Sequence, residues 1–187
     1  MLTRNSLMAI ALPFLSWKAH AQSDLRPFVG AGFGMENRIG FRGASVSGGI
    51  SFPFSDHLSG IGQLDFFHGN HVSGWNDVMN RRARYDQLMA SVRLGYNTGA
   101  VAGTGLLMQA GLAVRGGSTY HFDYGNVHEG VVTDAHYTTE KVRGNGFIIG
   151  MGYGFMINDR LNARVELTDQ AMLRINDMYT LSFTIGF

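Results

Sequence analysis

Several of the most chemically capable side chains in this sequence are flanked by apolar residues or glycine. They are Gln63, Asp65, Arg93, Gln109, Arg115, Arg164 and Glu166. A buried charge without a partner is costly, and removing one member of a buried ion pair costs about 3–5 kcal/mol. We therefore expect these carboxylate, guanidinium and amide groups to pair with one another. The alternative is that they line a narrow or gated path for ions.

Histidine and carboxylate residues gather in two polar stretches. His68 and His71 flank the first stretch. The second contains His121, Asp123, His128, Glu129, Asp134 and His136. Imidazole and carboxylate groups together suit zinc or copper, but their spacing here is loose. We predict no metal site and no cofactor, with a pH-dependent state of these stretches as an alternative.

The segments that contain these polar groups have a regular pattern of apolar residues. Apolar residues recur at every second position, which is the periodicity of a β-strand. Eight segments carry it, at 27–35, 43–54, 58–68, 85–96, 105–115, 143–157, 161–168 and 178–187. Most of them reach the about 9–11 residues that a tilted strand needs to cross a bilayer. Strands in globular proteins are shorter, at about 5–6 residues.

The connections between these segments alternate in length. Residues 55–57, 97–104 and 158–160 are short, whereas 69–84 and 116–142 are long and polar. Short turns on the periplasmic side and longer loops outside are typical of outer-membrane barrels. The sequence therefore predicts an all-β fold: an eight-stranded antiparallel transmembrane β-barrel with an up-and-down meander.

The apolar face of each segment is expected to point outward. The interior of an eight-stranded barrel is just wide enough for side chains to fill it, so the bulky apolar residues fit the exterior and the glycine-rich polar face fits the lumen. The lumenal charges would then form a polar plug. Backbone groups in hydrocarbon must be paired internally, so the last strand should pair with the first. A barrel closed in this way can be a monomer.

Aromatic residues near the strand ends are expected to form two girdles at the membrane interfaces. The periplasmic girdle would comprise Phe28, Phe52, Phe54, Tyr96, Phe155 and Phe187. The opposite girdle would comprise Phe41, Phe66, Tyr85 and Tyr179.

The N-terminus has the pattern of a secretory signal peptide. Arg4 precedes an apolar stretch at 7–15, and Ala19-His20-Ala21 is an A-x-A cleavage site. We expect residues 1–21 to be removed and 22–187 to form the barrel domain. The remaining chain is close to neutral, so its charge does not indicate a nucleic-acid partner. The chain has no cysteine, and its stability must come from backbone pairing and packing.

The two ends of the barrel domain resemble known outer-membrane sequences. The final strand resembles the C-terminal signal that the barrel-assembly machinery reads in outer-membrane barrels. Its matching residues are Tyr179, Leu181, Phe183, Ile185 and Phe187. The opening stretch, 27–34, looks like the first strand of the eight-stranded family that includes the outer-membrane protein A transmembrane domain and the opacity-like porins. The resemblance implies an outer-membrane location, with lipid and lipopolysaccharide as surroundings.

A basic cluster precedes the segment at 85–96. Arg81, Arg82 and Arg84 could bind phosphate, because guanidinium groups pair with it bidentately. At the outer-leaflet boundary the phosphates belong to lipopolysaccharide. We therefore predict a lipid A contact here, with a plain solvated turn as the alternative.

The function that these features favour is non-enzymatic. We expect a barrel with a plugged polar lumen and a structural or surface-interaction role through loops 69–84 and 116–142. The first alternative is a small porin. The second is a lipid A-modifying enzyme, since the deacylase barrels carry a His-x-Ser-Asn motif on the penultimate strand. Residues 164–170 contain neither histidine nor serine, and we predict no catalytic residues.

Overall fold

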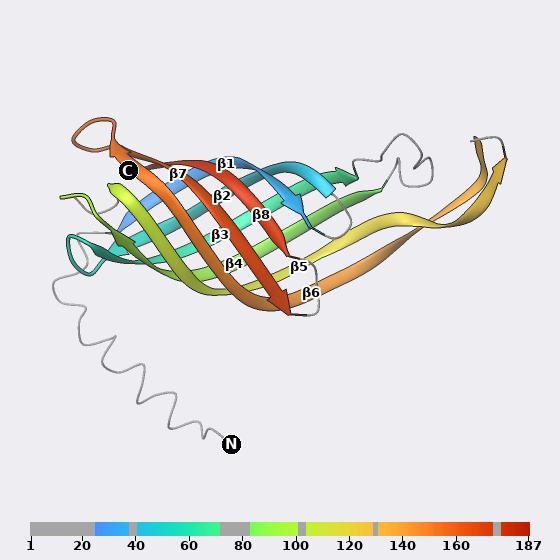
Figure 1. Cartoon of the computed structure of the whole chain (residues 1–187), viewed down its shortest axis with the longest axis horizontal. Coiled ribbons are helices and arrows are strands. Elements are labelled where there is room, and N and C mark those ends of the chain that lie inside the picture. The colour runs from blue at the N-terminus through green and yellow to red at the C-terminus, as the bar shows by residue number, and fades with distance from the viewer. Residues whose placement is uncertain (1–24, 38–40, 72–82, 101–103, 129–130, 174–176) are drawn as a thin grey trace, which may run out of the picture.

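The computed structural model describes residues 25–37, 41–71, 83–100, 104–128, 131–173 and 177–187. They form a closed barrel of eight antiparallel strands in sequence order (Figure 1). The strands are β1 (Arg26–Glu36), β2 (Phe41–Pro53), β3 (Leu58–His71), β4 (Arg84–Asn97), β5 (Gly105–His128), β6 (Val131–Met156), β7 (Asn162–Leu173) and β8 (Met178–Gly186). The predicted fold class is confirmed. No helix formed by the described residues is long and apolar enough to cross a membrane.

The barrel closes where β1 pairs with β8, from Phe28 opposite Gly186 to Glu36 opposite Met178. Glycine makes this seam possible. A Cβ atom at Gly30 would lie 2.5 Å from Cγ2 of Thr184, and a Cβ at Gly32 would lie 2.5 Å from the carbonyl oxygen of Leu181. Real Cβ atoms do not approach other atoms so closely, so any side chain here would push the two strands apart.

β5 and β6 are much longer than the sequence predicts, and the prediction of a connection at 116–142 is wrong. β5 continues to His128 and β6 begins at Val131. β5 pairs with β4 only as far as Tyr120, and β6 pairs with β7 only from Asn145. Residues 121–128 and 131–138, which we call the arm, therefore form a two-stranded hairpin that projects from the barrel, and residues 139–144 pair with 115–120 at its base (Figure 1).

The two ends of the barrel differ. The turns after β2 and β6 lie at the same end as the C-terminus (Figure 1), which we call the turn end. Both turns are tight: the Phe54 N–H donates to the carbonyl of Leu58 at 2.8 Å, and the Ile157 N–H donates to the carbonyl of Leu161 at 2.9 Å. The opposite end, from which the arm projects, is the arm end.

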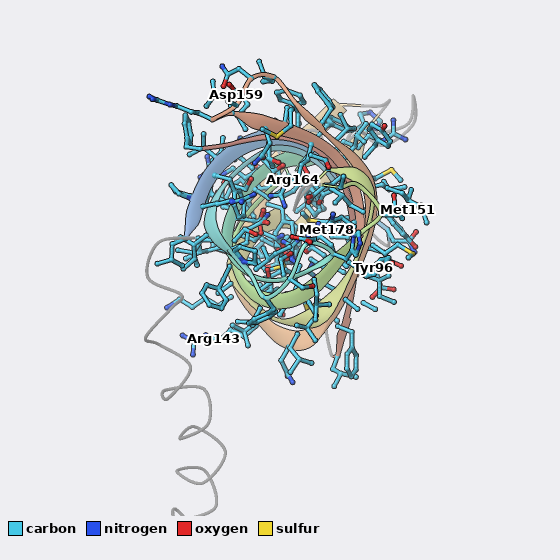
Figure 2. The ribbon with its side chains drawn as sticks, turned by 90° about the vertical axis from the view of Figure 1, so that its left-hand side faces the viewer. Tyr96, Arg143, Met151, Asp159, Arg164 and Met178 are labelled. Carbon is cyan, nitrogen blue, oxygen red and sulfur yellow. The ribbon has the colours of Figure 1, made fainter. Side chains whose placement is uncertain are left out.

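The apolar face of the strands points outward, as the sequence predicts. On β4, Val92 is 72% exposed and the next residue, Arg93, is 2% exposed. The same alternation runs round the barrel, because side chains on a strand point to opposite faces in turn. Figure 2 shows Arg164 and Met178 inside the ring of strands and Met151 and Tyr96 outside it.

Three aromatic residues expected in the girdles point into the lumen instead. Phe28, Phe41 and Tyr85 are 3%, 1% and 4% exposed, so their placement in the girdles is wrong. Their direction follows from the alternation of side chains along a strand. Each of the three lies at a position whose side chain points into the lumen. For Phe28, glycine on the neighbouring strand leaves room: a Cβ at Gly49 would come within 2.6 Å of the Phe28 ring.

Candidate functional site

The lumen contains a buried polar network centred on Arg93 of β4. Its Nη1 donates to Oε1 of Gln109 on β5, and its Nε donates to Oγ of Ser91, both at 3.1 Å. Its guanidinium group lies 3.8 Å from Oδ2 of Asp65 on β3 and 3.9 Å from Oε2 of Glu166 on β7. Lumenal residues from four strands therefore meet at one guanidinium group.

A second guanidinium group extends this network toward the turn end. Nε of Arg164 lies 3.3 Å from Oε1 of Glu166 and donates to Oγ1 of Thr184 at 3.1 Å. The same carboxylate oxygen of Glu166 accepts a hydrogen bond from Nε2 of Gln109 at 2.8 Å. The guanidinium of Arg164 also lies over the Phe28 ring, 4.7 Å from its centroid. Glu166 therefore connects Arg164 to the Arg93 side of the network.

The charges of the network balance. Asp65 and Glu166 oppose Arg93 and Arg164, and all four are buried. Nε2 of Gln63 donates to Oδ1 of Asp65 at 2.6 Å, which adds a neutral donor to one carboxylate. Because each charge has an opposite charge or a hydrogen bond beside it, the cost of removing these groups from water is offset.

Arg115 is not part of this network, although the sequence predicts that it pairs with the others. It is six residues from Gln109 along β5, which is about 20 Å on a strand. Its electrostatic neighbours are Tyr85, Glu36 and Asp177, nearer the arm end. Sequence reasoning did not single out Glu36, but its signal was present, because Glu36 continues the lumenal phase of β1 and is 2% exposed.

Apolar side chains fill other parts of the lumen. One cluster contains Phe41, Phe67, Ala83, Tyr85 and Met178. A second cluster contains Met89, Ala113, Ile148 and Met172. Near the turn end, the cavity beside Phe28 and Arg164 has a volume of about 20 Å³, which holds about one water molecule.

The arm and its base carry aromatic side chains that pair across the two strands. The rings of Tyr120 and Tyr137 stack with centroids 5.1 Å apart, and Phe122 meets Tyr137 edge-on at 5.7 Å. Farther out, Tyr124 stacks on His136 at 4.7 Å. We call these five residues the aromatic ladder. Cross-strand aromatic pairs stabilise a hairpin, and here they stabilise one that projects beyond the neighbouring strands of the barrel.

The backbone edges of the arm are open among the residues that the structure describes. Beyond Tyr120, β5 pairs only with β6, and before Asn145, β6 pairs only with β5. The pairing is irregular between Phe122 and Asn126, where the register shifts. An unpaired strand edge presents N–H and C=O groups to any strand that approaches it.

The predicted arginine cluster is only partly described. Arg84 is exposed at the start of β4, with its guanidinium 5.2 Å from the centroid of the Tyr120 ring. Arg81 and Arg82 lie outside the described residues. Arg84, the described member of the cluster, therefore lies against Tyr120 at the base of the aromatic ladder.

Two of the described histidines each lie beside a carboxylate. His68 pairs with Asp86 at 2.5 Å, and His136 pairs with Asp123 at 3.7 Å. Within the described ranges, no three His, Asp or Glu side chains are arranged to hold a metal ion.

The five residues of the predicted assembly signal lie on the outer face of β8 or just after it. They are Tyr179, Leu181, Phe183, Ile185 and Phe187. The Phe187 N–H donates to the carbonyl of Pro27 at 2.9 Å, so this segment also joins the last strand to the first. Recognition of these residues by the assembly machinery stays a prediction.

The sequence matches no protein-family model and no curated protein. Three solved structures show what the chain is similar to. The attachment invasion locus protein of Yersinia pestis is 13% identical, with a TM-score of 0.49 over 86% of this chain and 96% of that one. Neisserial surface protein A is 10% identical, with a TM-score of 0.49 over 87% and 94%. The outer membrane protein OprG from Pseudomonas aeruginosa is 12% identical, with a TM-score of 0.47 over 87% and 95%. At identities this low, the function of this chain has to follow from its own residues.

Proposed function

We propose that this chain is a bacterial outer-membrane barrel whose lumen is closed by its own side chains and whose arm binds a partner outside the cell. The exterior supports the membrane location. Outward residues such as Val92, Leu112 and Ile149 are more than 60% exposed, which is unfavourable in water and favourable in lipid. The strands form a closed ring without an unpaired edge, as a β protein in hydrocarbon requires.

The orientation follows from the two ends of the barrel. Short turns of outer-membrane barrels face the periplasm and longer segments face outward, so the arm lies outside. The test is fractionation of cells, followed by electrophoresis before and after boiling. We expect the chain in the outer-membrane fraction with different mobility in the two lanes. Recovery of the whole chain as a periplasmic protein would contradict the proposal.

Two observations support a closed lumen over the small-porin alternative. Paired charges meet around Arg93 inside the barrel, and two clusters of buried apolar side chains lie elsewhere in it. In planar bilayers, the purified chain is expected to show no steady conductance. Large, stable open channels from pure protein would favour the porin instead.

The aromatic ladder is the observation that carries the binding role. Tyrosine is enriched at protein interfaces and among the residues that dominate binding energy. Tyr124 is 61% exposed. Folding of the barrel does not require an exposed ring in the arm, so the ring is available to a partner. The open strand edges would add backbone hydrogen bonds to a partner in extended conformation. The partner class that fits this surface is a protein.

A direct test compares cells that display the chain with cells that display the Tyr124→Ala/Phe122→Ala variant. Adhesion is measured on surfaces coated with mixed matrix proteins and on matched surfaces coated with polysaccharide. We expect the variant to lose most of the adhesion to protein, at unchanged surface expression. Equal adhesion of both strains would contradict the role of the ladder, and a loss confined to polysaccharide would change the partner class.

The proposal includes no catalysis. Residues 164–170 on β7 supply Arg164 and Glu166 to the lumenal network, and the stretch holds no histidine or serine to attack an ester. Lipid A from cells that express the chain should therefore have an unchanged mass. A shift by one acyl chain would indicate an enzyme.

Three partner assignments belong to the same proposal. The chain is a monomer, the barrel-assembly machinery recognises its final strand, and Arg84 with Arg81 and Arg82 contacts lipid A phosphates. The triple alanine variant of these arginines should co-purify with less lipopolysaccharide than the wild type. Co-purification at the wild-type level would contradict the contact.

A further inference from the structure

An open groove runs over the outer wall of the barrel near the arm end. Its volume is about 790 Å³, and it crosses β3, β4, β5 and β6. One side is apolar and the other is basic. The side chains that define it are Phe66, Leu88, Ala90 and Val114 on the apolar side and Lys141 and Arg143 on the basic side.

The strand register explains the shape of the groove. Phe66 is opposite Leu88, Leu88 is opposite Gly116, and Gly116 is opposite Arg143. Across four neighbouring strands, two apolar side chains are followed by a bare glycine and then by a guanidinium group. A Cβ atom at Gly116 would meet only the carbonyl oxygen of Val142, at 4.0 Å. The floor of the groove is therefore open backbone with room above it.

The two basic side chains have no partner among the residues that the structure describes. Lys141 and Arg143 are exposed, and neither takes part in an ion pair or hydrogen bond there. Asp86, the acidic residue lining the groove, is occupied by His68 at 2.5 Å. Figure 2 shows Arg143 outside the ring of strands. Lys141 is also the only lysine after residue 21.

The spacing of the two cations suits a single anion. Residues two apart on a strand share a face and lie about 7 Å apart, and both side chains are long enough to reach one group between them. Ammonium and guanidinium groups both bind phosphate oxygens strongly. Below them, Ala90 and Val114 lead directly to Val92 and Leu112 on the exposed apolar wall. A ligand in this groove would therefore be anionic at one end and apolar at the other.

We propose that this groove binds one phosphate-bearing lipid of the outer leaflet. Its phosphate lies between Lys141 and Arg143, and an acyl chain lies along Phe66, Leu88 and Val114. This site rests on the proposed membrane location and is separate from the contact assigned to Arg81, Arg82 and Arg84. The lipid fixes the height of β5 and β6 in the membrane just below the arm.

The test places the purified full-length chain in neutral phosphatidylcholine nanodiscs and titrates it with lipid A. Native mass spectrometry then counts the lipid A molecules retained by each barrel. Lys141→Gln/Arg143→Gln removes both cations, and Gly116→Leu fills the groove without touching a charge. The matched control, Arg42→Gln/Arg160→Gln, removes two exposed cations that do not line the groove.

We expect the wild type and the control to retain one more lipid A than the two groove variants. The charge variant should bind it about thirtyfold more weakly, which is the combined effect of two basic residues at an anionic membrane surface. Gly116→Leu should lose the bound lipid as well. Wild-type retention by either variant would overturn the proposal. Displacement of the lipid by an equimolar amount of inorganic phosphate would also overturn it, because the apolar side would then add nothing to the binding of the phosphate group. If the wild type itself fails to insert and shows no heat-dependent mobility, the membrane location is wrong, and the site falls with it.

Discussion

β5 and β6 pass through two environments, and the same two strands differ between them. Inside the barrel, from Leu107 to Tyr120, β5 has a neighbour on each side, and its side chains alternate between a lumen and an apolar exterior. In the arm, each strand has one described neighbour, and most of the described side chains on both faces are exposed or half-buried. Both regions are β-strand, but different interactions stabilise them.

In the barrel, charges are buried and must be paired, whereas apolar residues are exposed. In the arm, the side chains of His136 and Asp123, which form an ion pair when the histidine is protonated, are exposed, and the stability depends on stacked rings. Exposed ion pairs contribute little, at about 0–1 kcal/mol, while buried ones are costly to break. We therefore expect the barrel to depend on single lumenal residues and the arm to tolerate substitution.

The largest effect is expected for Glu166→Gln. The change keeps the size of the side chain but leaves Arg93 and Arg164 with one carboxylate, Asp65, between them. The free energy of unfolding should fall by about 3–5 kcal/mol, measured by urea titration of the barrel with the heat-dependent gel shift as the readout. Thr168→Val, at the next lumenal position of β7, is the control and should cost much less. An exposed ion pair contributes about 1 kcal/mol or less. If Glu166→Gln lowers the free energy of unfolding by no more than that, the barrel does not depend on its buried charges more than the arm depends on its exposed ones.

A charge on the outer wall should have the next largest effect. Val92 is 72% exposed at the middle of β4, and Val92→Arg is expected to cost about 2–4 kcal/mol in lipid. The same urea titration in phospholipid vesicles checks this, with Val92→Leu as the apolar control. An exposed valine in water would tolerate arginine, so an unchanged stability would show that this wall does not face hydrocarbon.

Within the arm, Tyr137→Ala removes the ring that both Tyr120 and Phe122 contact. Cross-strand aromatic pairs contribute about 0.2–1 kcal/mol each, so amide hydrogen exchange in the arm should speed up several-fold. Exchange in the barrel strands should stay unchanged. Loss of protection in β1 or β8 would show that the arm and the barrel unfold as one unit.

The smallest effect on the barrel is expected from shortening the arm. Residues 123–136 are replaced by Asn-Gly, which favours a two-residue hairpin turn between Phe122 and Tyr137. The free energy of unfolding of the barrel should change by no more than about 0.5 kcal/mol, as for surface changes in general. A larger loss would mean that the arm stabilises the barrel.

Alternating hydropathy was enough to predict the barrel strands, because lipid and lumen impose opposite chemistry on successive residues. The same rule explains the miss in the arm. Where both faces are exposed to water, hydropathy no longer alternates, and 121–128 looks like a polar loop. The remaining signal was the alternation of Tyr120, Phe122 and Tyr124, which are residues that favour strands. Lys141 also lies within the stretch that was wrongly predicted to be a connection.

Position parity also predicted which side chains enter the lumen, but not how high they lie in it. Arg93 and Arg115 share the lumenal face and still belong to different groups, because their height depends on the stagger between strands. Phe28 shows the opposite case. Its aromatic side chain suggested the membrane interface. Its position on the strand and the glycine beside it place the ring in the lumen.

The glycines that face β8 across the seam make the last step of assembly demanding. Until β1 meets β8, the nascent sheet has two open margins, each able to accept a foreign strand. Gly30 and Gly32 allow the margins to meet only when the backbones come into close apposition, since nothing larger than hydrogen fits between them. A cylinder built this way has no partly closed form that is well packed. The chain is therefore expected to complete its ring in one cooperative event, so that an incompletely sealed intermediate does not persist in the bilayer.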